Sequence, residues 1–186
     1  NQRLTAVNGN HLNSNNHSDV KSIEFIDCTG STFIPRNMLN FFPNLIGVRL
    51  VNCGILILSG NELNEYGNLS LFAVEGTQLE RIPGNFFSST PLISIVGFAD
   101  NKLKHVGSKL FNDLTNLSWI SFYNNECINQ TATTQEEISM LIGNLTLQCV
   151  DILEITTTTT VITTTEMSST VSTTEMQTTT LKAGII

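Results

Sequence analysis

A pattern of apolar residues recurs along this chain at a nearly constant period. In residues 117–125, apolar side chains take positions one, four and six of the pattern, and an asparagine takes position nine. Five copies begin at residues 20, 45, 69, 93 and 117, so the period is 25 and then three times 24. Position nine holds cysteine twice, then threonine, then asparagine twice. A period of this length indicates a repeat architecture, in which each copy forms one supersecondary unit.

Each repeat predicts a short strand that ends in a turn. Alternation places Ile120 and Phe122 on one face of such a strand and the neighbouring residues on the other face. One repeat cannot bury its apolar face alone, so successive coils are expected to stack around a shared core. At position nine the backbone turns inside that core, where each unmatched polar group costs about 1–3 kcal/mol. An asparagine there can bond to the turns above and below it, and a threonine can supply its hydroxyl.

The repeats also match the pattern of a known family. The segments that carry the match are LERIPGNFF (79–87) and DNKLKHVGSKLFNDLTNL (100–117), and residues 20–149 as a whole resemble the extracellular leucine-rich repeat family. More narrowly, SDVKSIEF, FPNL and NNECIN are similar to segments of small secreted leucine-rich repeat proteins of insects. The resemblance implies an α/β solenoid, a short horseshoe with a parallel concave sheet and irregular convex turns. Its five repeats would occupy residues 20–125.

The C-terminal end of the repeats has a helical pattern. Thr134 and Glu137 form a capping box, and the apolar residues that follow lie on one helical face. These residues are Ile138, Leu141, Ile142 and Leu145. Such a helix would cover the core of the last coil, in a cap of residues 126–153. The family resemblance implies that a disulfide between Cys127 and Cys149 holds it there, although the common form of this cap has four cysteines.

Cys28 and Cys53 occupy position nine in adjacent coils. We expect two stacked, buried thiols, because cysteine is small and tolerates burial. A disulfide is the alternative, since adjacent coils lie about 4.8 Å apart, but side chains that point the same way match its torsion poorly. Before the repeats, residues 1–19 predict a partial N-terminal cap. LTAVNGNHL (4–12) has the turn signal of a hairpin, and residues 13–19 are polar and predict a loop.

Beyond the cap the composition changes. Of the 25 residues in 156–180, 17 are Thr or Ser, so residues 154–186 predict a disordered, mucin-like stalk with O-glycans, or a plain flexible tail. The final six residues, LKAGII, are too few to cross a bilayer, and they would belong to a membrane anchor only if the chain continues. Five N-glycosylation sequons are present, at Asn16, Asn68, Asn116, Asn129 and Asn144. Repeats, cap cysteines and stalk together predict a secreted or cell-surface protein.

Charge and motifs narrow the function. The formal net charge is −7 and only 13% of residues are charged, so the chain lacks the basic surface that nucleic acids or anionic membranes require. The sequence contains no nucleophile with a base, no phosphate-binding glycine loop and no Cys/His cluster at metal-ligand spacing. We therefore expect no catalysis, no metal and no cofactor; a secreted hydrolase is the third alternative.

The concave face of the sheet is the candidate binding surface. Leu71, Ile95 and Trp119 should align across three coils, with Tyr123 on the same face and small residues between them. Exposed aromatic residues on a rigid sheet are typical anchors for a protein partner. The predicted partner-binding residues are Arg49, Leu71, Glu75, Ile95, Trp119 and Tyr123. The sequence thus predicts a non-catalytic extracellular module that binds a protein partner; alternatively, it is a surface-coat glycoprotein in which the solenoid is a spacer.

Overall fold

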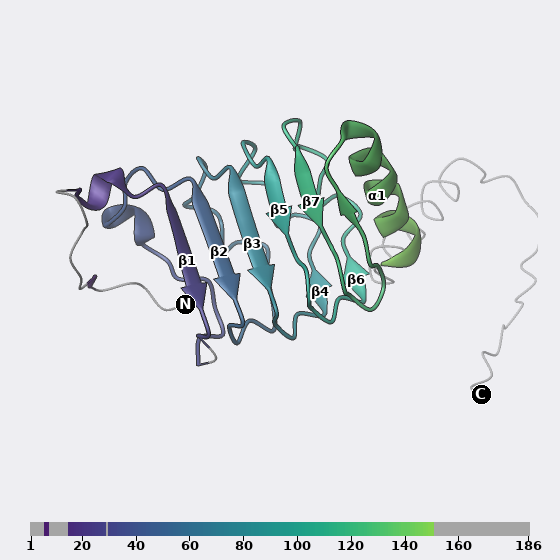
Figure 1. The fold of residues 1–186 in the computed structure, drawn as a ribbon, viewed down its shortest axis with the longest axis horizontal. Helices are drawn as coiled ribbons and strands as arrows, with labels where there is room; N and C mark the ends of the chain where they lie inside the picture. Colours follow the sequence, from purple (N-terminus) through teal and green to yellow (C-terminus); the bar gives the residue numbers. More distant parts are fainter. Residues whose placement is uncertain (1–5, 8–14, 29, 151–186) are drawn as a thin grey trace, which may run out of the picture. The chain divides into compact units, whose positions relative to one another are not determined.

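The computed structural model describes residues 6–7, 15–28 and 30–150. Within these ranges the chain forms a solenoid whose five parallel strands stand side by side and point the same way (Figure 1). The strands are β1 (Ser22–Ile26), β2 (Gly47–Val51), β3 (Leu71–Glu75), β5 (Ile95–Gly97) and β7 (Trp119–Ser121). Their Cα register pairs residues 25 positions apart between β1 and β2 and 24 apart in the later pairs, as the repeat predicts. The predicted solenoid with a parallel sheet is confirmed.

The remaining elements are short, apart from one helix. β8 (Thr131–Ala132) adds to β7 in the antiparallel direction and makes six strands within the described part of the sheet. β4 (Arg81–Ile82) and β6 (His105–Val106) form a separate parallel pair. Two 3₁₀ turns are present: η1 (His17–Asp19) lies just before the first coil, and η2 (Met38–Asn40) lies within it. The helix α1 (Gln135–Gln148) follows β8 and lies at the end of the sheet beyond β7 (Figure 1).

The core lies between the inward faces of the strands and the turns behind them. Inward side chains of neighbouring strands stack, as Val48, Phe72, Val96 and Ile120 do, and all four are fully buried. Aromatic rings continue this stack, with centroids 5.0–6.4 Å apart. The rings in contact are Phe72, Phe86, Phe87, Phe98, Phe111 and Phe122. Each coil therefore seals the apolar side of its neighbour.

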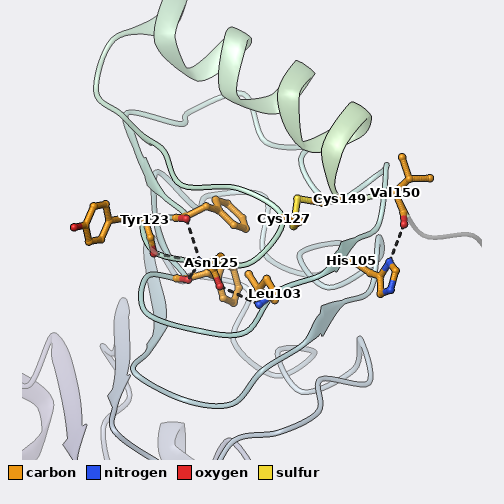
Figure 2. The surroundings of a disulfide bond; sticks show 9 residues. Leu103, His105, Tyr123, Asn125, Cys127, Cys149 and Val150 are labelled. Atoms are coloured by element: carbon orange, nitrogen blue, oxygen red, sulfur yellow. Dashed lines mark hydrogen bonds between the residues drawn. A yellow bond between two sulfur atoms is a disulfide. The ribbon is translucent and has the colours of Figure 1, made fainter.

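Asparagine at position nine bonds to its own coil and to the one before. The Nδ2 of Asn101 donates to the carbonyls of Val74 at 2.7 Å and Phe98 at 3.1 Å, and its Oδ1 accepts from the Thr77 amide at 3.1 Å. Asn125 repeats the arrangement one coil later, with Phe98, Phe122 and Leu103 (Figure 2). The predicted role of these asparagines is confirmed, with one difference. Among the described residues, their side-chain bonds run to the preceding coil and to their own, and none runs to a following turn.

Position eight adds a feature that the sequence analysis did not predict. All five residues there have left-handed backbone, with φ between 52° and 64°. They are Asp27, Asn52, Gly76, Asp100 and Asn124. These types adopt this conformation most readily, and each of the first four donates its amide to a carbonyl of the next coil at 2.9–3.1 Å. The side chains also bond in pairs, Asn52 to Asp27 at 3.0 Å and Asn124 to Asp100 at 2.7 Å.

The prediction of two free thiols at Cys28 and Cys53 is wrong, because the two residues form a disulfide. Stacking of the first two coils brings their Cα atoms to 4.3 Å, just below the usual range of about 4.4–6.8 Å for a disulfide. At this separation the sulfur atoms meet even though both side chains leave stacked turns. The first two coils are thus joined covalently at the position where later coils use threonine or asparagine.

The C-terminal cap has the predicted form. Thr134 and Glu137 make both bonds of the capping box, and Ile138, Leu141 and Leu145 are buried against the last coil. A disulfide joins Cys127 to Cys149, with Cα atoms 5.2 Å apart (Figure 2). The bridge therefore closes the loop that carries β8 and α1, and it ties the end of the helix back to the last strand.

His105 contacts the segment that follows α1. It lies half-buried in β6, and its Nδ1 is 2.8 Å from the carbonyl oxygen of Val150 (Figure 2). This contact lies beside the bond between the amide of Val106 and the carbonyl of Cys149. The segment after α1 is therefore attached to the wall formed by β4 and β6.

Some predictions fall outside the described residues. The hairpin of residues 4–12 is mostly outside them, as is the Thr-rich stalk of residues 154–186. Within the predicted loop of residues 13–19, residues 17–19 instead form η1, because Asn16 and Asp19 make a capping box at its start. None of the helices in the described ranges is long and apolar enough to span a membrane.

Replacing Asn101 with alanine tests the role of position nine. The change leaves the buried carbonyl of Val74 and the amide of Thr77 without their Asn101 partner, so the free energy of unfolding should fall by about 3 kcal/mol. Urea unfolding measures the loss. Asn112→Ala, at an exposed site, is the matched control and should change stability by less than about 0.5 kcal/mol. Equal effects of the two changes would contradict the role assigned to Asn101.

Replacing Gly76 with alanine tests the left-handed conformation at position eight, where the chain leaves the strand; we call this turn the corner. A Cβ at this residue would lie 2.3 Å from Oδ1 of Asn52, on backbone with φ of +64°. We expect a loss of about 1–2 kcal/mol from the backbone conformation alone. Gly30→Ala is the control, since nothing lies within 4 Å of a Cβ at that site. Thermal unfolding of both variants decides the point, and an unchanged midpoint for Gly76→Ala would show that the corner is not strained.

Candidate binding face

The outward side chains of the sheet form rows that run from strand to strand. We call this side of the sheet the open face. The strand register makes Leu71, Ile95 and Trp119 consecutive Cα partners, and all three are half-buried. We call them the apolar row. Two residues further along each strand lie Ala73, Gly97 and Ser121, the small-residue row. The predicted alignment of the apolar row is therefore what the structure shows, and Tyr123, 56% exposed, follows the small-residue row by two residues.

An ion triad occupies the other half of the open face. Arg49 donates from Nε to Oε2 of Glu75 at 2.9 Å, and its Nη2 bonds to the same oxygen. Its Nη1 bonds to Oε1 of Glu24. The hydrogen bond with Glu75 is the largest of the effects that raise the pKa of Arg49. Arg49 is thus held between two carboxylates and is not a free cation.

Glu75 is the most sheltered member of the triad. Its side chain is 15% exposed, against 45% for Arg49 and 41% for Glu24. The shelter comes from the small-residue row, because a Cβ at Gly97 would lie 2.7 Å from Oε1 of Glu75 and 2.9 Å from Cβ of Ala73. Glycine at residue 97 is therefore what allows the carboxylate to lie across β5.

The carboxyl ends of the strands carry an excess of negative charge. Glu24 and Glu75 lie on the open face, and the exposed Asp27 and Asp100 follow β1 and β5 at the corner. Arg49 is the basic residue that contacts two of these carboxylates. Because one guanidinium cannot balance four carboxylates, this half of the face should have a negative potential.

The structure brings together the residues that the sequence predicted, in two groups. Leu71, Ile95 and Trp119 form one group, and Arg49 with Glu75 forms the other. Glu24 is not among the predicted binding residues, although the sequence contains a signal for it. Glu24 and Arg49 occupy the same position in consecutive coils, and opposite charges at paired positions of neighbouring strands attract each other.

The described residues also form a hollow away from the open face. It measures about 520 Å³ and is lined by Leu56, Ile57, Leu58, Gln78, Glu80 and Arg81. Ile57 is 76% exposed there. A smaller hollow of about 250 Å³ lies between β8 and α1, beside Gln130, Met140 and Asn144. No cluster of His, Cys, Asp and Glu in the described ranges could hold a metal ion.

The glycosylation candidates differ in what their side chains do. Asn68 and Asn116 are exposed just before β3 and β7. By contrast, Asn16 caps η1, Asn129 accepts a bond from the amide of Asn124, and Asn144 donates to Gln130. Asn68 and Asn116 are thus the sequons at which a glycan would disturb the fewest bonds.

Comparison with known proteins assigns no relative. A scan of the chain against protein-family models finds no match, and a search of curated proteins finds no similar sequence. The site must therefore be interpreted from its own geometry.

Replacing Arg49 with glutamine tests whether the ion triad stabilises the fold. Both Arg49 and Glu24 are nearly half exposed, and exposed ion pairs contribute little, so we expect a loss below about 1 kcal/mol. Urea unfolding at low and at high salt measures it, and the difference from the native chain should shrink as salt screens the pair. A loss above about 2 kcal/mol would show that the triad holds the sheet together and does more than orient Glu75.

Proposed function

We propose that this chain is a non-catalytic, extracellular recognition module of leucine-rich repeat type, which binds a protein partner through the open face. The observation that carries the proposal is the apolar row. Leu71, Ile95 and Trp119 lie on the solvent side of a sheet whose other side already supplies the core. Apolar side chains in this position add little to the packing of the coils, but they offer area to a partner.

The scaffold suits recognition because it is rigid. Two disulfides, the asparagine bonds and a continuous aromatic core fix the strands, so the outward rows keep their spacing when a partner binds. A preorganised surface avoids part of the entropic cost of association. Trp119 and Tyr123, at the end of the sheet nearest the cap, are of the residue types that most often dominate binding energy.

An extracellular location agrees with the covalent structure. Both described cysteine pairs form disulfides, and disulfides persist mainly in oxidising compartments. The Thr- and Ser-rich stretch after residue 154 and the exposed sequons at Asn68 and Asn116 fit the same location. In this proposal the stretch is a stalk that distances the solenoid from whatever it is attached to.

The proposal is tested by panning a displayed library of extracellular domains on the full chain. Binders that recognise the open face should lose capture by the double variant Trp119→Ala with Tyr123→Ala. The matched control is Met140→Ala with Leu147→Ala, which removes two apolar side chains of similar or greater exposure from α1. Unfolding midpoints confirm that each variant is folded.

Two results would count against the proposal. Capture that survives the open-face double variant would place binding elsewhere. Capture that disappears when residues 154–186 are deleted would favour the surface-coat alternative, in which the stalk matters and the solenoid is a spacer. A recognition module should keep its binder without the stalk.

A further inference from the structure

One oxygen of Glu75 is left without a partner on the open face. Both nitrogens of Arg49 that reach Glu75 bond to Oε2. Oε1 lies over Gly97 and accepts no hydrogen bond from the described residues. It is not sealed from solvent, because no fully buried side-chain oxygen in the described ranges lacks a partner. Oε1 of Glu75 is therefore in contact with solvent, and its position is set by the bonds of Oε2 to Arg49.

The fixed position of Oε1 separates Glu75 from an ordinary surface carboxylate. Arg49 holds the other oxygen, and the small-residue row leaves the space that the carboxylate fills. A partner cation that bonds to Oε1 would meet a group whose rotamer is already fixed, so little side-chain entropy is lost. A charge-assisted bond of this kind is about twice as strong as a neutral one.

The surroundings favour a cation over any other group. Glu24 lies on the same half of the open face, Asp27 and Asp100 lie at the corner beside it, and Arg49 is already bonded to two carboxylates. The whole chain carries a net charge of −7, which also attracts a basic partner from a distance. An anionic segment would be repelled here.

We propose that the open face recognises a basic segment of its protein partner, in which a Lys or Arg bonds to Oε1 of Glu75 and a nearby apolar side chain packs on the apolar row or on Tyr123. This inference rests on the proposed function. Tyr123 lies in the same outward row as Glu75, two coils away, or roughly 10 Å at the usual strand spacing. An extended peptide covers that distance in about three residues, so the basic and apolar residues should be about three positions apart.

The test uses random twelve-residue peptides displayed on phage and panned against the full chain. Peptides that need Trp119 and Tyr123 for capture should be enriched in a Lys or Arg about three positions from an aromatic or aliphatic residue. The best of them is synthesised with its basic residue intact and replaced by Gln. Binding of both peptides is then measured to the native chain and to the Glu75→Gln variant.

The four affinities form a double-mutant cycle. On the native chain, loss of the basic residue should weaken binding about tenfold or more, the equivalent of a charged hydrogen bond. On the Glu75→Gln variant the same loss should have almost no effect. Glu75→Asp, which keeps the charge but withdraws the carboxylate, should weaken binding nearly as much as Gln does. Glu136→Gln, an exposed carboxylate on α1, is the charge control and should leave affinity unchanged.

The outcomes separate this inference from the proposed function. Peptides that depend on Trp119 and Tyr123 but lack a basic residue, or that respond equally on Glu75→Gln, overturn the inference and leave the binding face intact. Peptides that ignore the Trp119 and Tyr123 changes, or the absence of any enriched peptide, count against both. Equal weakening by Glu75→Gln and Glu136→Gln would reduce the effect to general charge and would also overturn the inference.

Discussion

The structure depends on how each coil satisfies its backbone where the chain leaves the strand. At that corner the chain turns inside the stack, away from the strand pairing that serves the residues before it. Two adjacent positions solve the problem together. Position eight takes the left-handed conformation that Asp, Asn and Gly adopt most readily, and position nine places a bonding side chain beneath it. The pair Asn124–Asn125 therefore has two different roles, since Asn124 makes the corner and Asn125 fills its hydrogen bonds.

The corner also sets the register and spacing of the strands. Because each corner bonds to a neighbouring coil, the strands are locked in register, with residues 24 or 25 positions apart facing each other. At the two ends of the solenoid, disulfides provide the link between neighbouring segments. Cys28 and Cys53 join the first coils at position nine, and Cys127 with Cys149 holds the helix that covers the last coil. Side chains on the open face take no part in these bonds. The spacing of their rows is therefore set by the corners and not by the outward side chains themselves.

Much of the fold can be predicted from the sequence, because the spacing of apolar residues reflects which side chains are buried. The five strands, the capping box at Thr134 and the alignment of Leu71, Ile95 and Trp119 all depend on spacing alone. The Cys28–Cys53 disulfide does not follow from an idealised stack, in which the two side chains point the same way, whereas the actual Cα separation of 4.3 Å lets the sulfur atoms meet. Glu75 could be placed on the open face, but spacing cannot tell that Arg49 takes only one of its oxygens or that Gly97 makes room for the other.

Glu75 also shows how a solenoid can acquire a specific site without rebuilding its core. On the open face a side chain is limited mainly by its neighbours on the same strand and in adjacent coils, and three of them act on Glu75. Arg49 orients the carboxylate of Glu75, Ala73 has a side chain short enough not to block it, and Gly97 leaves the space that it occupies. Each of these residues is one coil from Glu75 or on the same strand. Because the coils repeat, a change at one such position alters the surface by one row and leaves the corner bonds as they were. The fold thus fixes where the outward side chains stand, and the local choice of charge and size sets what they can bind.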